Sequence, residues 1–456
     1  MSKAETAFDL EAQIRSWSDC LRARGNFSEA DLNELEQHLR DEIEDLARAG
    51  LAADEAFLIS VKRLGNTDSL SREYSKINTE NLWRQLLLDR EPGAGARIRR
   101  EVTLVVVFSL LAGTLAKLPE LFGLGLYDPR HQLFYLKNLS FFILPLLALF
   151  FHLKRNDGWR RIVPVMGVFI LSALLVNLYP SRAPRATEFL TGIHLPIFLW
   201  LITGLAYAGT AWRSTARRMD FIRFTGEAFI YAVLIGCGVM VLAAFTQMIF
   251  AAIQVDLSKF TQEYLIVYGL CAVSFIAVYL VEAKKSIVEN FAPVLARIFS
   301  PLFLVTMSAF LAVMLAQGRS PFADRNFLIG FDVMLALVLG LVLYIISARD
   351  VHEPPGLFDR LNLALIAVAL IIDGIALSAI VSRLSSYGIS PNKLAALGEN
   401  IALLVNLAGL AFAYLGYLLR RSGFSRLERW QTGYLGLYLA WAGFVAFIFP
   451  IVFGFR

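Results

Sequence analysis

Residues 361–394 read LNLALIAVALIIDGIALSAIVSRLSSYGISPNKL, an apolar run followed by a short polar turn. Asp373 is the only charged residue of the run, 361–382, and a helix of that length, at about 1.5 Å per residue, crosses a hydrocarbon core of roughly 30 Å. In the turn, Gly388 permits a sharp change of backbone direction, while Ser390 and Pro391 provide the N-cap and first-turn proline of a next helix. The stretch therefore predicts two membrane-spanning helices joined by a tight connection.

Apolar runs of this kind recur along the whole chain. Hydrophobic residues make up 57% of the sequence and charged residues 18%, with a mean hydropathy of +0.58, which excludes an ordinary soluble protein. We predict an all-α polytopic transmembrane helical bundle of about eleven spans. They lie near 102–121, 134–153, 161–180, 188–210, 224–253, 264–282, 300–317, 326–347, 361–382, 395–419 and 433–453. The stretch 283–300 is amphipathic and fits a helix on the membrane surface or one that dips into it.

Charge is divided unevenly between the two ends of the chain. Residues 1–100 hold 19 of the 38 acidic residues but only 15 of the 43 basic ones. Leucines and isoleucines at helical spacing between Ser28, a predicted N-cap, and Gly50, a predicted C-cap, indicate an amphipathic helix within a small bundle. We therefore predict a cytoplasmic helical prefix domain at 1–80, a linker helix at 81–100 with a hinge at 92–95, and a transmembrane domain at 101–456.

The prefix carries two segments, LEQHLRDEIEDLARAGLAADEAF (35–57) and VKRLGNTDSLSREY (61–74). In composition and order they resemble the permease prefix domain, also described as a helical signalling domain, which precedes membrane segments in bacterial proteins. The resemblance implies a small helical fold with a coupling or regulatory role, not a catalytic one.

The distribution of cations between loops predicts the orientation. The first hundred residues contain no signal peptide, so the chain is expected to start in the cytoplasm. The loops that would then face the cytoplasm carry roughly 17 Lys and Arg against about 8 on the opposite side. We predict a multi-pass protein of the bacterial inner membrane with a cytoplasmic N-terminus and, after eleven spans, a periplasmic C-terminus.

Several ionisable residues lie within the predicted spans, where they are costly and are candidates for a functional site. Lys117, Glu120, Lys137 and His194 fall in the outer halves of spans 1, 2 and 4. We predict that five further residues, from spans 8, 9 and 10 and the turn between the last two, form one connected polar cluster on the periplasmic side: Asp332, Asp373, Arg383, Lys393 and Glu399. Two interpretations remain open, structural pairs that lock three helices together or a polar cavity that receives an ion or an anionic group.

The turn YGISPNKL (387–394) resembles the signature of a bacterial family of polytopic membrane proteins, the domain of unknown function 4153, and the likeness extends over most of 100–456. This family brings no established activity. The match carries over Tyr387, Gly388, Asn392 and Lys393 as its hallmark positions. Lysine stands at 393 where the family more often has arginine, which weakens the case for a bidentate contact with an anion there.

Common catalytic and nucleotide-binding motifs are absent from the sequence. It contains no phosphate-binding lysine loop, no H-E-x-x-H, no G-x-S-x-G and no acidic metal cluster. We therefore expect no enzyme activity, no catalytic residues, no metal and no cofactor, and no binding to nucleic acid. Small residues at Gly409, Ala413 and Gly416, and at Gly236 and Gly238, predict helix-packing surfaces.

Two function classes fit these observations. The first is a permease-like protein, embedded in the lipid bilayer, that binds or moves an unidentified ion or small solute through the polar cluster. The alternative is a membrane-embedded signalling or regulatory protein whose prefix domain engages a cytoplasmic protein partner. The large number of spans favours the first, and the sequence leaves the oligomeric state open.

Overall fold

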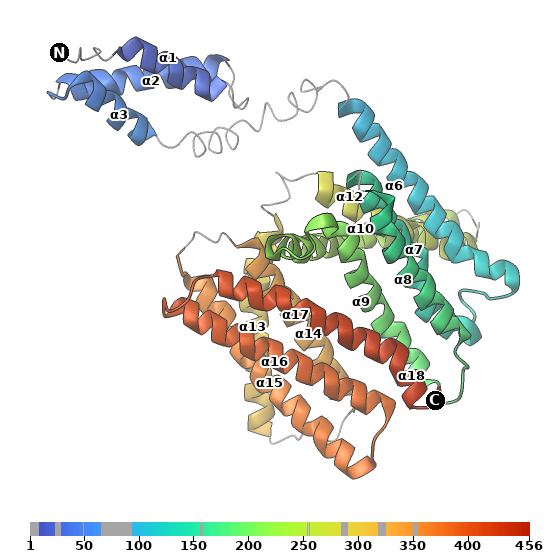
Figure 1. The fold of residues 1–456 in the computed structure, drawn as a ribbon. Coiled ribbons are helices and arrows are strands. Elements are labelled where there is room, and N and C mark those ends of the chain that lie inside the picture. Colours follow the sequence, from blue (N-terminus) through green and yellow to red (C-terminus); the bar gives the residue numbers. More distant parts are fainter. Residues whose placement is uncertain are drawn as a thin grey trace. The chain divides into compact units, whose positions relative to one another are not determined.

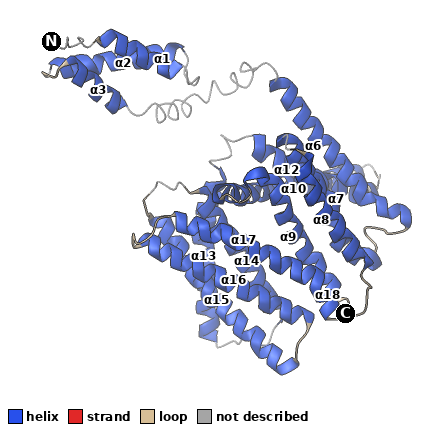
Figure 2. Cartoon of the chain, in the orientation of Figure 1, coloured by secondary structure: helices blue, strands red, loops and turns tan. Residues whose placement is uncertain are grey.

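The computed structural model describes residues 9–22, 29–48, 50–64, 94–155, 158–252, 254, 256–283, 291–317, 325–349 and 354–456. Helices and short turns account for these residues, and the described part of the chain contains no β-strand (Figure 2). The predicted all-α fold class is confirmed. Two compact units divide the chain, Met1–Ile98 and Arg99–Arg456.

Three helices form the first unit, α1 (Leu10–Arg22), α2 (Glu29–Arg48) and α3 (Ala53–Leu64). Their apolar stripes face one another, as the helical spacing predicts, and α2 is followed by Gly50 with a positive φ of 96°. The predicted N-cap, Ser28, lies outside the described residues. The core consists of Ile14, Trp17, Leu35, Leu39, Ile43, Ala56 and Phe57.

An arginine on α2 links it to α1. Nη1 of Arg40 lies 2.6 Å from Oε1 of Glu11, and its Nη2 donates to Oε1 of Glu36 at 2.9 Å. The hydrogen bonds from Arg40 stabilise the charged carboxylate and hold the pKa of Glu11 below its usual value.

The predicted linker lies mostly outside the described residues, which resume at 94. Helix α6 (Ala94–Lys117) begins there, so Ala94 and Gly95, which the sequence places in a hinge, are helical. The helix can include them because alanine is the best helix former and a glycine in the first turn costs only about 1 kcal/mol.

The second unit is a bundle of long helices, drawn in Figure 1. Within the described residues, ten helical segments are long and apolar enough to cross a membrane. The chain is therefore a multi-pass membrane protein. These segments coincide or overlap with ten helices of the bundle: α6, α7 (Gln132–Arg155), α8 (Trp159–Leu178), α9 (Ala186–Ala208), α10 (Thr215–Ala252), α12 (Val267–Ala283), α14 (Arg325–Ala348), α15 (Leu357–Tyr387), α16 (Pro391–Leu418) and α17 (Ser425–Gly443).

The remaining predicted span, 300–317, falls within α13 (Phe291–Gln317). Its apolar part among the fully described residues, Ile298–Met314, is shorter than the other ten. Part of the amphipathic stretch 283–300 belongs to the first turns of this same helix, and residues 284–290 lie outside the described chain. From 291 onward the stretch therefore continues directly into an apolar helix.

Two apolar cores hold the bundle together. One contains residues of helices α6, α7, α8, α9 and α12. It is rich in aromatic side chains, among them Phe150, Phe151 and Phe275. The other joins α13 to α17 around Leu365, Leu407 and Tyr414. Helix α9 packs against α16 and α17, and α10 packs against both α12 and α14. These contacts connect the two cores and bring the start of α9 next to α16.

Many large apolar side chains on the outside of the bundle are exposed. In a soluble protein they would form an oversized apolar surface, whereas in a bilayer they face lipid. The interior of the bundle is therefore where polar side chains require an explanation.

Candidate functional site

Three carboxyl side chains from consecutive helices approach one another within the bundle. They are Asp332 of α14, Asp373 of α15 and Glu399 of α16, and Asp332 lies close enough to interact electrostatically with both of the others. The sequence predicted this grouping from the depth of each residue in its span. The structure brings the three acidic members of the predicted cluster together.

Asp373 is the most buried of the three. Its exposed fraction is 0%, and neither Oδ1 nor Oδ2 has a hydrogen-bond partner in the described structure. A charged carboxylate in such surroundings costs several kcal/mol, similar to the free-energy cost of a charged side chain at the centre of a bilayer. Asp373 therefore requires a proton or a cation to neutralise it.

Asp332 has an amide as its partner and, among the described residues, no cation. Nδ2 of Asn400 donates to Oδ1 of Asp332 at 2.9 Å and also to the carbonyl of Ala396, one turn earlier on α16. Asn400 itself is fully buried, and its Oδ1 has no partner in the described structure. The sequence analysis missed Asn400, although a buried amide directly after a membrane-embedded glutamate is a recognisable signal.

Glu399 forms a short contact across to α9. Nε2 of His194 lies 2.5 Å from Oε1 of Glu399, and Nδ1 of His194 lies 2.9 Å from the carbonyl oxygen of Leu190. A carbonyl only accepts, so Nδ1 must carry a hydrogen, and a second proton must lie between Nε2 and Oε1 because two bare acceptors repel. The pair therefore holds one shared proton, either as imidazolium with carboxylate or as imidazole with carboxylic acid.

The two cations of the predicted cluster have other surroundings. Lys393 donates from Nζ to the carbonyl of Gly388 at 2.8 Å, and its ammonium lies 5.4 Å from the centre of the Tyr387 ring. Nη1 of Arg383 is buried without a hydrogen-bond partner in the described part of the chain. Neither cation forms an ion pair with Asp332, Asp373 or Glu399, so the five residues do not form one connected cluster.

Spacing along the helix explains the separation. Ten residues divide Asp373 from Arg383, which is about 15 Å along an α-helix. Lys393 lies in the first turn of α16 beside the tight connection and donates to the carbonyl of Gly388. The carboxylates thus lie deeper than the cations that were expected to neutralise them.

The hallmark turn has the local structure that the sequence predicts. Gly388 has φ 71° and ψ 178°, a backbone conformation that strains residues with a Cβ. Oγ of Ser390 accepts a hydrogen bond from the backbone N–H of Lys393, and Pro391 occupies the first turn of α16. Tyr387 and Asn392 are exposed. These four hallmark positions thus shape and border the connection and do not line the carboxyl cluster.

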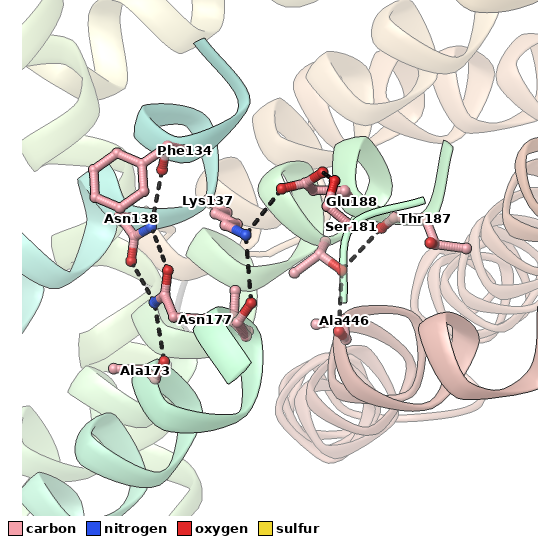
Figure 3. Close-up of polar contacts among 11 residues, drawn as sticks. Phe134, Lys137, Asn138, Ala173, Asn177, Ser181, Thr187, Glu188 and Ala446 are labelled. Atoms are coloured by element: carbon pink, nitrogen blue, oxygen red, sulfur yellow. Dashed lines mark hydrogen bonds and ion pairs between the residues drawn. The ribbon is translucent and has the colours of Figure 1, made fainter. Parts of the chain in front are cut away.

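A separate polar group lies where α7, α8 and α9 meet (Figure 3). Nζ of Lys137 is 2.9 Å from Oε1 of Glu188, whose Oε2 accepts a hydrogen bond from Ser181. Beside them Asn138 and Asn177 exchange two amide hydrogen bonds, at 2.9 and 2.7 Å. Every charge here has a partner, which is typical of a structural contact.

Lys117 is similarly occupied. Its Nζ lies 2.5 Å from Glu120 and 3.8 Å from Glu263. Sequence reasoning singled out Lys117, Glu120 and Lys137 but missed the partners Glu188 and Glu263, which begin other apolar segments at the same end of the bundle. Matching ionisable residues by the end of the span at which they fall would have found them.

The carboxyl cluster is thus defined by Asp332, Asp373, Glu399, His194 and Asn400. Within the described residues, no group of three or more His, Cys, Asp and Glu side chains is placed to hold a metal ion. Among the described residues, Asp332 and Asp373 have no cation paired with them, and carboxyl groups of this kind can exchange protons or accept a small cation. No family model, no curated protein and no solved structure matches the chain.

Proposed function

We propose that this protein is permease-like and that its carboxyl cluster takes up and releases protons, or a small cation, as part of moving an ion or small solute across the membrane. The observation that carries the proposal is Asp373, a fully buried carboxyl group with no partner for either oxygen. Such groups within membrane spans commonly form proton relays and ion pathways.

The neighbours of Asp373 support exchange of a cation over binding of an anion. Asp332 adds negative charge potential beside it, Glu399 interacts in turn with Asp332, and Asn400 contributes amide dipoles without net charge. His194 and Glu399 hold one proton between them and connect the cluster to α9. An anionic solute would face repulsion at this site, whereas a proton or cation would relieve it.

Orientation belongs to the same proposal. We place the N-terminus in the cytoplasm of a bacterial cell and the cluster nearer the periplasmic face, on the strength of the cation excess in alternate loops. Membership of the unknown-function family and of the prefix-domain family rests on the quoted motifs and is part of this proposal.

The test is an isosteric substitution, Asp373→Asn, which keeps the shape of the side chain and removes its capacity to bind a proton or cation. We expect proteoliposomes of the parent protein to give a transient current on a solid-supported membrane after a step in H⁺, Na⁺ or K⁺ concentration. The variant should give no current at unchanged protein yield. Asp220→Asn, at a partly exposed carboxylate on α10, is the matched control and should behave as the parent.

The outcomes separate the two interpretations of the cluster. A variant that retains the current refutes the proposal. A variant that cannot be purified because it misfolds shows that Asp373 serves to hold helices together, and it refutes the proposal as well.

The alternative function, signalling through the prefix domain, is favoured by one observation: the first unit has its own apolar core. Removing residues 1–90 distinguishes the two functions. A permease-like protein keeps its ion-dependent current after the deletion. A signalling protein shows no current in either form and loses its cellular effect with the prefix.

A further inference from the structure

A basic groove lies between α16 and α17 at the end of the bundle where α16 ends and α17 begins. Its volume is about 820 Å³, and its lining includes Phe412 of α16 and Ser422, Arg426, Arg429 and Trp430 of the following segment. It lies away from the carboxyl cluster, which is near the opposite end of α16. The groove plays no part in the proposed exchange of protons or cations.

Arginine dominates the charge at this groove. The segment 420–429, RRSGFSRLER, contains four arginines and one glutamate. The guanidinium of Arg426 lies over the ring of Phe412 at 4.9 Å, and Nε of Arg429 donates to the carbonyl of Ser425 at 3.3 Å. Both side chains are therefore oriented by neighbours while their remaining N–H groups stay available. Two guanidinium groups in one groove can donate paired hydrogen bonds to the oxygens of a phosphate.

The groove also contains a polar atom without a partner. Oγ of Ser422 is buried and has no hydrogen-bond partner in the described structure. A ligand oxygen in the groove would satisfy it. Nε1 of Trp430, by contrast, already donates to Asn406 on α16 at 3.0 Å, which fixes the indole as an apolar wall.

An apolar stripe continues from the groove along the outside of α16. Phe412 is 63% exposed, and Val405, Leu415 and Leu419 on the same face are about half exposed. These positions differ by three, four or seven residues, so they lie in one row along the helix. A ligand with a charged head and long apolar tails would contact both the arginines and this row.

The same combination recurs elsewhere on the bundle. A groove of about 470 Å³ between the start of α8 and the end of α9 is lined by Arg160, Arg161 and Trp212. The hydrogen bond from Arg218, near the start of α10, to the carbonyl of Thr432 on α17 places both grooves at the same end of the bundle. Two basic grooves with a tryptophan at one end indicate contact with one leaflet of the membrane.

We propose that the groove between α16 and α17 binds the phosphate headgroup of an anionic phospholipid, with its acyl chains along the exposed row of α16. A lipid fits better than free phosphate because the apolar row extends from the cationic site. It also fits better than a zwitterionic lipid, because the local charge of the segment is positive. Basic pockets between helices at this depth commonly hold such headgroups.

The test uses phosphatidylcholine vesicles that contain a small fraction of photoactivatable phosphatidylglycerol, with the purified full chain reconstituted into them. After illumination, mass spectrometry locates the crosslinks. We expect labelling of the peptides that contain 409–430. Arg426→Gln/Arg429→Gln should lower the affinity at this site about thirtyfold, from roughly five- to sixfold for each arginine. The control, Arg217→Gln/Arg360→Gln, removes two exposed arginines outside the groove and should leave labelling unchanged.

Three results would overturn the proposal. Equal loss of labelling in the control would show that only overall charge matters. Equal labelling by a photoactivatable phosphatidylcholine would show lipid packing without headgroup recognition. Displacement by inorganic phosphate would show a site for free anions. Because all four arginines are exposed, the variants are expected to fold, and unchanged circular dichroism confirms that they do.

Discussion

The ion pair between Arg349 and Asp359 allows a quantitative test of how the second core is held. Nε and Nη2 of Arg349 donate to Oδ1 and Oδ2 of Asp359, both at 2.9 Å, and the two side chains are 9% and 5% exposed. The guanidinium also lies over the rings of Tyr417 and Phe424, at 5.1 and 4.9 Å. This pair thus connects the end of α14, the start of α15 and the end of α16.

Removing one partner leaves the other as a buried, uncompensated charge. Arg349→Met should therefore lower the free energy of unfolding by about 3–5 kcal/mol. Asp359→Asn should cost a similar amount, because it leaves the guanidinium without a counter-charge and weakens the bond to the backbone N–H of Gly356. The double variant, which leaves no unpaired charge, should cost clearly less than the sum of the two.

Unfolding of the purified protein in mixed detergent micelles with increasing dodecyl sulfate, followed by circular dichroism, measures these differences. Arg360→Met, at the exposed neighbour of Asp359, is the control and should change stability by at most about 0.5 kcal/mol. Additive costs in the double variant, or a cost below about 1 kcal/mol for Arg349→Met, would refute the assignment of a buried, coupled pair.

Three further predictions concern glycines and the prefix unit. Gly409→Ala places a Cβ 2.0 Å from a tryptophan ring and should lower the free energy of unfolding by about 1–3 kcal/mol, whereas Gly236→Ala, which meets no atom within 4 Å, should not; thermal unfolding compares them. Gly388→Ala, at φ 71°, should cost about 1 kcal/mol in the same assay, and no change would show that the turn relaxes. Arg40→Gln should raise the pKa of Glu11 toward the ordinary 4.5, and titration of its carboxyl carbon by NMR measures this change. Because the folded-state pKa is lowered, the contact stabilises the prefix above about pH 4.5, and this stabilisation is lost on acidification.

Much of the membrane architecture could be predicted because it depends on local sequence. Span length and apolar content follow from the thickness of the bilayer, and turn residues such as Gly388 and Ser390 act on their own backbone. Helix packing was predicted less evenly. Gly409 packs closely against Trp430, as expected, but Gly236 has open space around it, so its predicted packing surface is wrong for the described structure. A small residue permits close packing and does not enforce it.

The candidate site was predictable only in part, because its contacts are tertiary. Depth along the chain placed Asp332, Asp373 and Glu399 at similar levels, and helices joined by short connections are neighbours. The contact between His194 and Glu399 joins residues that are far apart in sequence, and no local pattern identifies which face of α9 meets α16. Depth alone also grouped Arg383 with Asp373, although ten residues of the same helix, about 15 Å, separate the two.

The carboxylates of the membrane domain differ in the kind of partner that each one contacts. At the helix ends carboxylates are paired with cations, and these contacts can be understood as structural: Lys117 with Glu120, Lys137 with Glu188, Lys154 with Glu101 and Glu282, and Arg349 with Asp359. Asp332 has an amide, and Asp373 has no partner in the described structure. A carboxyl group that locks helices gains nothing from lacking a partner, because burial then only raises the free energy of the folded state. A group that must bind and release a proton or cation needs to be free of a permanent cationic partner, since a fixed ammonium or guanidinium would hold it permanently ionised and neutralised. The contrast within one bundle is therefore the physical basis of the proposal that Asp373 takes part in exchange while the paired carboxylates have structural roles.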